Sequence, residues 1–161
     1  MQNAEALEQA VIIRRRLNAP VDIVYRVWTD PRFASRWSWG AAYTSMFVDI
    51  DCRMGGAWRQ VIRHKETGEV WSFEGQFREV VPNAKLVHTF HWTNDRAADE
   101  GKSLVAIEFL SRGQETEVVI THTQLQTQKQ RKGTQAGWLD ILECVERCLP
   151  STNQPDAEVP R

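Results

Sequence analysis

Residues 51–58 of the chain read Asp-Cys-Arg-Met-Gly-Gly-Ala-Trp, and a long segment of alternating character follows them. Glycine adopts positive φ without steric cost, so the pair at 55–56 predicts a sharp bend at the start of a strand. Trp58 adds a large apolar surface with one polar N–H group. A second glycine–tryptophan pair, at 137–138, lies in a segment of helical periodicity. Together the two pairs predict a curved sheet that grips a helix around a cavity.

Length and charge limit the classes of protein to which the chain can belong. It has 161 residues, of which 42% are hydrophobic, and its 20 basic and 21 acidic side chains give a formal net charge of -1. This size predicts one domain that folds around its own core. The balanced charge predicts that the protein does not bind nucleic acid. No segment has the roughly 18 apolar residues of a membrane span, so none is expected.

The cysteines and one basic run bear on location and metal binding. Residues 14–16 are all arginine, but no long apolar region follows them, so an export signal is not expected. Cys52, Cys144 and Cys148 are an odd number of thiols, which favours a soluble, cytoplasmic protein with reduced cysteines. Cys144 and Cys148 are one helical turn apart and could act as neighbouring metal ligands, but burial on a helix is the favoured reading. We therefore expect no metal and no cofactor.

Hydrophobic periodicity divides the chain into a folded body and two ends. Residues 1–9 are polar and residues 150–161 contain three prolines, so both ends are expected to be disordered around one domain over residues 10–149. Alternation predicts a first strand over residues 11–17, and two short helices follow it. Further strands are expected near residues 46–50, 58–65, 71–78, 86–92, 105–109 and 118–122, with a long loop at 93–102.

The last periodic segment is predicted to be a long amphipathic helix. Thr127 and Gln130 have the spacing of a capping box at its start. Its apolar stripe consists of Trp138, Ile141, Leu142, Val145 and Leu149. Gly133 and Gly137 leave one side of its first half without bulk, which indicates either close packing on the sheet or room for a ligand. The expected fold class is α+β, with a curved antiparallel sheet of about seven strands around this helix and two short helices between the first and second strands.

This order of elements resembles the helix-grip fold of the START-like superfamily, also called SRPBCC or Bet v-like. Seven motifs follow one another as in one of its families: Arg15-x-x-x-Ala19-Pro20, Trp28-Thr29-Asp30-Pro31, the cluster Trp37 to Gly40, Asp51-x-Arg53-x-Gly55-Gly56-x-Trp58, Gly75, Thr116 and Gly137-Trp138. They are similar to the family named for the C-terminal domain of the activator of the ninety-kilodalton heat-shock protein ATPase. Family members often carry two adjacent tryptophans followed by Gly-Pro, whereas residues 37–41 here read Trp-Ser-Trp-Gly-Ala. The loop over the cavity mouth is therefore expected to differ.

The resemblance implies three hypotheses on function, because one fold hosts many activities. Superfamily relatives bind sterols, lipids, plant hormones or polyketides, which implies binding of a small, largely hydrophobic molecule between sheet and helix. Some relatives are cyclases or hydrolases, so an enzyme acting on such a molecule is an alternative. The namesake stimulates a chaperone ATPase with the help of a separate N-terminal domain, which is not expected in this chain. A contact with a chaperone, or between two copies of the chain, is a further alternative.

The candidate site residues follow from the parity of the strands and the stripe of the helix. Side chains on the face turned toward the helix can line a cavity or fill the core, and both readings stay open. The ligand-binding candidates are Arg15, Trp37, Trp39, Trp58, Gln60, Ile62, His64, Trp71, Phe73, His88, Phe90, Trp92, Ile107, Phe109, His122 and Trp138.

Three of the four histidines fall on the inward face. His64, His88 and His122 are therefore the candidates for general acid or base catalysis, while His91 points outward. The sequence contains no His-Glu-x-x-His pattern, no paired cysteines at zinc spacing, no nucleophile elbow and no phosphate-binding glycine loop.

Arg15 lies on the apolar face of the first strand, where its charge needs a partner. The favoured reading is a structural ion pair, and the partners considered are Glu108, Glu117 and Glu79. The alternative is a fixed cation that holds an anionic head group of a ligand.

Overall fold

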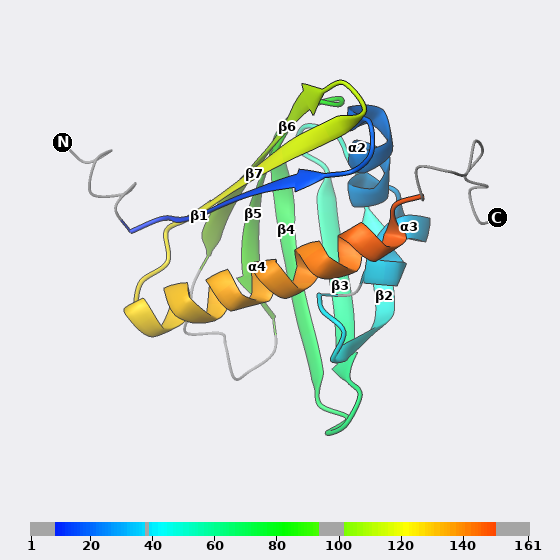
Figure 1. Cartoon of the computed structure of the whole chain (residues 1–161). Helices are drawn as coiled ribbons and strands as arrows, with labels where there is room; N and C mark the ends of the chain where they lie inside the picture. Colours follow the sequence, from blue (N-terminus) through cyan, green and yellow to red (C-terminus); the bar gives the residue numbers. More distant parts are fainter. Residues whose placement is uncertain (1–8, 38, 94–101, 151–161) are drawn as a thin grey trace.

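The computed structural model describes residues 9–37, 39–93 and 102–150. A seven-stranded antiparallel sheet in the order β1-β7-β6-β5-β4-β3-β2 curls behind one long helix, α4 (Figure 1). The elements are β1 (Val11–Leu17), α2 (Val21–Thr29), α3 (Pro31–Trp37), β2 (Tyr43–Ile50), β3 (Ala57–His64), β4 (Val70–Val81), β5 (Lys85–Trp92), β6 (Ser103–Arg112), β7 (Glu115–Thr123) and α4 (Gln128–Cys148). The expected α+β fold is confirmed. The predicted disordered ends and the loop at 93–102 fall almost wholly outside the described residues.

The bend at residues 51–58 forms for the reason that the glycine pair predicts. Gly55 has a φ of +83°, and a Cβ on Gly56 would lie 2.0 Å from the carbonyl oxygen of Asp51. The turn is held to β4 by hydrogen bonds between the backbones of residues 55–56 and Phe77. Because Gly55 can adopt a positive φ and Gly56 has no Cβ that would meet Asp51, the chain can fold tightly back before β3 begins.

Trp58 is positioned by a third glycine on the neighbouring strand. It pairs with Gly75 of β4, where a Cβ would lie 2.5 Å from the indole nitrogen of Trp58. The indole Nε1–H donates to the carbonyl of Thr89 at 3.3 Å. The ring is therefore laid flat over β4 and supplies part of the interior wall.

The C-terminal half of α4 anchors the helix to the sheet. Ile141, Leu142 and Val145 are completely buried, as the apolar stripe predicts. Each such side chain contributes about 1.5–3 kcal/mol when it is fully buried. Thr127 caps the helix, and its hydroxyl accepts from the backbone N–H of Gln130 at 3.0 Å, as in the expected capping box. The second bond differs from that of a capping box, because Gln130 Oε1 accepts from the backbone N–H of Gln126 at 2.8 Å.

The predicted ion pair of Arg15 exists, but the predicted partners are wrong. Its guanidinium Nε lies 3.0 Å from a carboxylate oxygen of Glu146 on α4. Glu117 instead pairs with arginines 14 and 112, and Glu79 pairs with Lys85. Glu108 does not pair with Arg15, because α4, rather than a neighbouring strand, covers this face of β1.

Candidate ligand-binding site

A pocket of about 570 Å³ lies between the N-terminal half of α4 and strands β3 to β5. We call it the outer pocket. Its lining is Trp39, Tyr43, Ile62, Trp71, Phe90, Trp92, His122, Gln126, Thr127, Lys129, Gln130, Gly133, Thr134, Gly137 and Trp138. The sheet supplies mainly aromatic and aliphatic side chains, whereas the helix supplies small and polar ones. Such a lining suits an apolar ligand that makes a few polar contacts.

The spacing of Gly133 and Gly137 in α4 indicated either close packing on the sheet or room for a ligand, and the structure distinguishes the two. A Cβ on Gly133 or on Gly137 would meet no atom within 4 Å. Close packing on the sheet would bring atoms to the position of that Cβ, as it does at Gly75. The glycines therefore leave open space on the helix face that borders the outer pocket.

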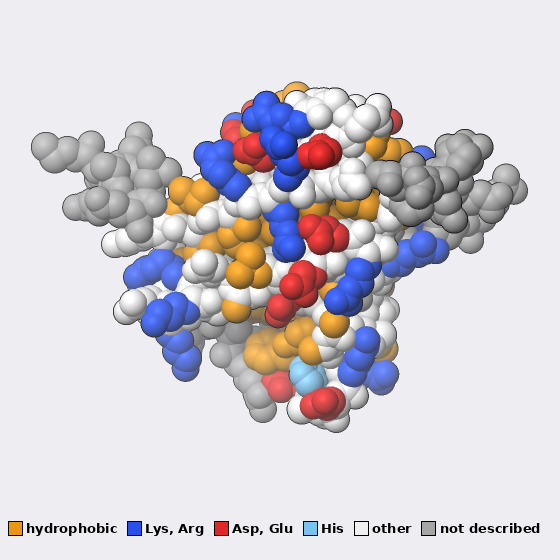
Figure 2. Space-filling model, in the orientation of Figure 1, with side chains coloured by type: hydrophobic (Ala, Val, Ile, Leu, Met, Phe, Trp, Pro, Cys, Tyr) orange, Lys and Arg blue, Asp and Glu red, His pale blue; other side chains and the backbone are white. Residues whose placement is uncertain are grey.

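Charge is distributed unevenly along α4. Basic side chains gather at its N-terminal end and acidic ones lie farther along it, as Figure 2 shows. Lys129 is the only charged residue in the lining of the outer pocket among the described residues. The rest of this pocket is neutral, which matches a ligand that is largely uncharged.

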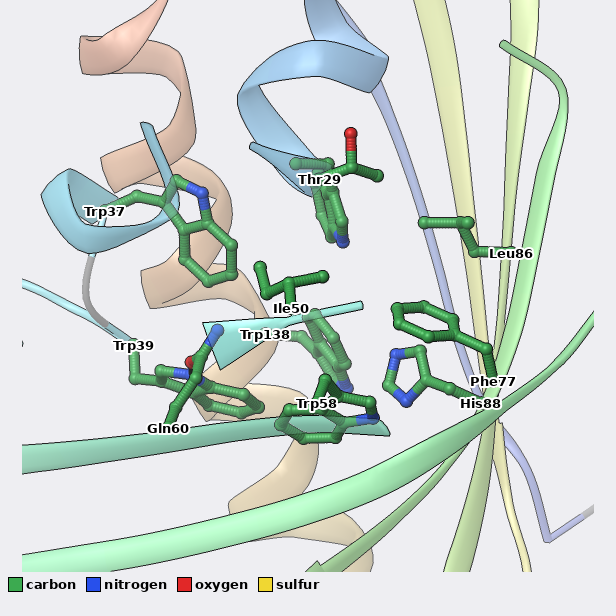
Figure 3. A pocket seen from close by; sticks show the side chains of 11 residues that line it. Thr29, Trp37, Trp39, Ile50, Trp58, Gln60, Phe77, Leu86, His88 and Trp138 are labelled. Carbon is green, nitrogen blue, oxygen red and sulfur yellow. Dashed lines mark hydrogen bonds between the residues drawn. The ribbon is translucent and has the colours of Figure 1, made fainter. Parts of the chain in front are cut away.

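A second, smaller space of about 40 Å³ lies deeper between the sheet and the helices. We call it the inner compartment. Its lining is Trp28, Thr29, Trp37, Trp39, Ile50, Trp58, Gln60, Phe77, Leu86, His88 and Trp138 (Figure 3). Trp39 and Trp138 line both spaces, and their ring centroids are 5.7 Å apart. These two indoles therefore form the partition between the outer pocket and the inner compartment.

Trp39 belongs to neither a helix nor a strand. Its φ is +48°, an uncommon value for a bulky residue, and Gly40 follows with a φ of +119°. The ring packs edge-on against Phe73, with centroids 4.3 Å apart, and its Nε1–H donates to Oε1 of Gln60. The turn thus inserts one aromatic side chain between two cavities.

Trp138 is held more firmly, through His122. The indole Nε1–H can only donate, so His122 Nδ1 accepts it, at 3.0 Å. The proton of His122 therefore sits on Nε2, which donates to Ser103 Oγ at 2.7 Å, and that hydroxyl donates to the carbonyl of Phe90 at 3.2 Å. Burial, and secondarily the neighbouring His88, lowers the pKa of His122 to about 3. The ring is neutral and both its nitrogens are occupied.

His88 differs from His122 in having one unoccupied nitrogen. Its Nδ1 lies 2.9 Å from the carbonyl of Thr89, which can only accept, so Nδ1 carries the proton. Burial lowers the pKa of His88 to about 4, which leaves the ring neutral. Its Nε2 is thus an acceptor, and no described residue donates to it.

The three predicted inward histidines do not share a cavity. His88 lines the inner compartment and His122 the outer pocket. His88 of β5 pairs with Val105 of β6, which pairs with His122 of β7. The two histidines are thus two strand spacings, or roughly 10 Å, apart. His64 lies at the turn after β3, where its Nδ1 accepts from the backbone of residues 66 and 67. Among the described residues, no group of three or more His, Cys, Asp or Glu side chains is placed to hold a metal ion.

Most of the predicted site residues border one of the two spaces. The outer pocket receives Trp39, Ile62, Trp71, Phe90, Trp92, His122 and Trp138, and the inner compartment receives Trp37, Trp39, Trp58, Gln60, His88 and Trp138. Five candidates line neither space: Arg15, His64, Phe73, Ile107 and Phe109. Phe73, Ile107 and Phe109 are buried in the core. Strand parity could not predict this, because it gives the face on which a residue lies and not its depth.

Sequence reasoning missed the polar wall that α4 contributes. Lys129, Gln130 and Thr134 belong to the helix, and Gln126 and Thr127 directly precede it. Tyr43 of β2 was missed as well. A signal for two of them exists in the sequence. Gln130 and Thr134 are three or four residues from Gly133 or Gly137, so they share one helix face with these glycines.

The curled sheet, the long helix and the space between them define the helix-grip fold of the START-like superfamily. The family model described as "Activator of Hsp90 ATPase homolog 1-like protein" matches residues 18–149, and the chain belongs to this family. No curated protein matches the sequence.

Solved structures agree with this assignment. A protein from Chromobacterium violaceum is 20% identical with a TM-score of 0.78, over 87% of this chain and 96% of that one. A protein from Arthrobacter aurescens is also 20% identical with a TM-score of 0.78, over 96% and 95% of the two chains. An AHSA1-like protein from Aeromonas hydrophila is 22% identical with a TM-score of 0.69, over 86% and 90%. At these identities the likeness concerns the fold. No helix in the described part of the chain is long and apolar enough to cross a membrane.

Proposed function

We propose that the protein binds a small, largely hydrophobic organic molecule in the outer pocket. The observation that carries this proposal is the volume of about 570 Å³ between an aromatic wall of the sheet and a helix face with two glycines. Pockets for small molecules commonly have about 300–1,000 Å³ and a mostly apolar lining with few polar groups. A space of this size bordered by Trp71 and Trp92 is larger than the gaps of a packed core.

The direct test is binding of naphthalene, followed by quenching of tryptophan fluorescence, together with native mass spectrometry of gently purified protein. Replacing Gly137 by leucine fills the pocket without a backbone clash, because its Cβ position is open. We expect Gly137→Leu to weaken naphthalene binding at least about tenfold, which corresponds to roughly 1.4 kcal/mol. The matched control is Gly137→Ala, which adds a single methyl group and is expected to bind nearly as wild type.

Two outcomes would count against this proposal. One is that the wild-type protein fails to bind naphthalene. The other is that Gly137→Leu binds it as tightly as Gly137→Ala, which would place the bound molecule away from α4.

The enzyme and the chaperone contact remain predictions from the family resemblance. Catalysis by the predicted histidines requires two of them, or one with Arg15, at a common point, and His64, His88 and His122 border different regions. For the chaperone contact, stimulation of a chaperone ATPase by the purified protein is the measurement, and no effect at saturation would oppose it. No contact of the described residues favours either alternative over ligand binding.

A further inference from the structure

The inner compartment is lined by residues with polar atoms that have no hydrogen-bond partner among the described residues. Gln60 and His88 are 6% and 8% exposed, and Figure 3 shows their side chains reaching the compartment from opposite sides. Gln60 Oε1 accepts from Trp39, but its Nε2 has no acceptor among the described residues. Nor does any described residue donate to His88 Nε2. Each of these two atoms is therefore free to form a hydrogen bond with a group that enters the compartment.

Neither of these atoms is fully buried in the protein, so a small polar group can reach both. Among the described residues, only His91 Nδ1 is a fully buried side-chain nitrogen or oxygen without a partner. Gln60 and His88 both line the compartment, as does Trp28, whose indole N–H also lacks an acceptor in the described part of the chain. A group that enters this space therefore meets two unpaired donors and one unpaired acceptor.

The compartment selects the chemistry of such a group. None of its lining residues carries a charge, so an ammonium or carboxylate group would lose its hydration without a counter-charge. Nε2 of a neutral His88 accepts only from an O–H or N–H group. The volume of about 40 Å³ holds roughly three water-sized groups, since one needs about 10–15 Å³. A hydroxyl group fits these conditions, because it is small, uncharged, and both a donor and an acceptor.

The two spaces are separated by side chains that are unequally held. Trp138 is fixed by the hydrogen bonds of His122 and by the rigid helix α4. The indole of Trp39 also makes one hydrogen bond, to Gln60, but Trp39 lies in a turn with positive φ and the Gln60 side chain has no second partner among the described residues. Backbone strain of this kind often marks functional positions. Displacement of the Trp39 ring would join the inner compartment to the outer pocket.

We propose that the inner compartment is a subsite for the hydroxyl end of a neutral alcohol or phenol whose apolar body occupies the outer pocket. The hydroxyl group donates to His88 Nε2 after the ligand passes Trp39. This inference rests on the proposed function and adds the class of ligand to it.

The test compares 2-naphthol with naphthalene and 2-methoxynaphthalene, which have the same ring system but no O–H donor. We expect wild-type protein to bind 2-naphthol about tenfold more tightly than either, the effect of one well-formed buried hydrogen bond. In His88→Phe the order is expected to reverse, because burying an unpaired hydroxyl costs free energy. His91→Phe makes the same replacement on the outward face and is expected to keep the wild-type preference.

His88→Phe is suited to this test because the fold loses little. Phenylalanine keeps a ring between Trp58 and Phe77, whose centroids lie 5.0 and 5.7 Å from that of His88. The carbonyl of Thr89 keeps the indole N–H of Trp58 as a donor at 3.3 Å. A second measurement uses wild-type protein alone. The ¹⁵N resonance of His88 Nε2 is expected to shift upfield with 2-naphthol and to stay in place with 2-methoxynaphthalene.

The outcomes separate the two proposals. If no naphthalene derivative binds, both fall. If all three bind equally to wild type and His88→Phe, and the His88 resonance does not move, the hydroxyl subsite is refuted while the outer pocket stands. A preference for 2-naphthol that survives in His88→Phe would refute the subsite as well, because another group would then be receiving the hydroxyl.

Discussion

The two halves of α4 differ in what they contact, although they form one continuous helix. In the C-terminal half, Ile141, Leu142 and Val145 are fully buried against the rest of the molecule. In the N-terminal half, Gly133 and Gly137 face open space and border the outer pocket. The packed half can hold the helix in place, so the open half does not need to close on the sheet. One half of the helix therefore contributes packing, and the other half borders the pocket for which ligand binding is proposed.

The largest expected effect is in the packed half. Leu142→Ala removes a completely buried side chain and is expected to lower the free energy of unfolding by about 2–5 kcal/mol. Thr134→Ala, in the open half, is the control and is expected to change it by no more than about 0.5 kcal/mol. Urea unfolding of the two variants measures both values. An equal loss of unfolding free energy in the two variants would mean that the two halves of α4 contribute equally to stability.

A smaller effect is expected where the halves meet, at Trp138 and its partner His122. The pKa of His122 is about 3 in the folded protein and ordinarily 6.5, so the unfolded chain takes up the proton first as the pH falls. The stability that this neutral histidine gives is complete above about pH 6.5. Below that it declines by at most about 1.4 kcal/mol per pH unit.

His122→Phe provides the comparison for this pH dependence. It leaves the indole N–H of Trp138 without its acceptor and the hydroxyl oxygen of Ser103 without its donor, so we expect a loss of about 1–3 kcal/mol at pH 7. The difference from wild type is expected to shrink as the pH is lowered from 6.5 to 4. Unfolding curves at several pH values would record it. A difference that is constant over this range would contradict the lowered pKa of His122.

The smallest effect is expected in the open half, and it has the opposite sign. Gly133→Ala should raise the free energy of unfolding by about 0.5–1 kcal/mol, because alanine favours the helix and its methyl group meets no atom within 4 Å. Gly75→Ala makes the same change where the methyl group would lie 1.9 Å from the carbonyl of Thr89, and it should be destabilising. Thermal unfolding distinguishes the two. A destabilised Gly133→Ala would show that this half is packed after all.

The sequence predicted the fold better than it predicted the pocket, for physical reasons. The period of two and the apolar stripe of α4 reflect burial, which the strands and Leu142 show directly. The partner of Arg15 was wrong because Glu146 comes from α4, and strand parity says nothing of how a helix crosses the sheet. The strand expected near residues 46–50 forms, but a bulge between Ser45 and Phe47 interrupts its period and Met46 is 53% exposed.

The candidate site was predicted in part, on the side of the sheet. Trp71 and Trp92 were identified by parity, whereas Lys129 and Gln130 were missed because the polar face of α4 was not considered as a wall. The partition by Trp39 could not be predicted. It depends on a turn with positive φ at a position that no glycine marks.

The central claim is that the outer pocket binds a hydrophobic molecule under the open half of α4. The most direct test follows the indole N–H resonances of all seven tryptophans while naphthalene is added to the ¹⁵N-labelled protein. We expect large shifts for Trp71 and Trp92, which line only the outer pocket, and small ones for Trp28 and Trp58, which line only the inner compartment. Saturating naphthalene that leaves Trp71 and Trp92 unmoved would contradict the claim.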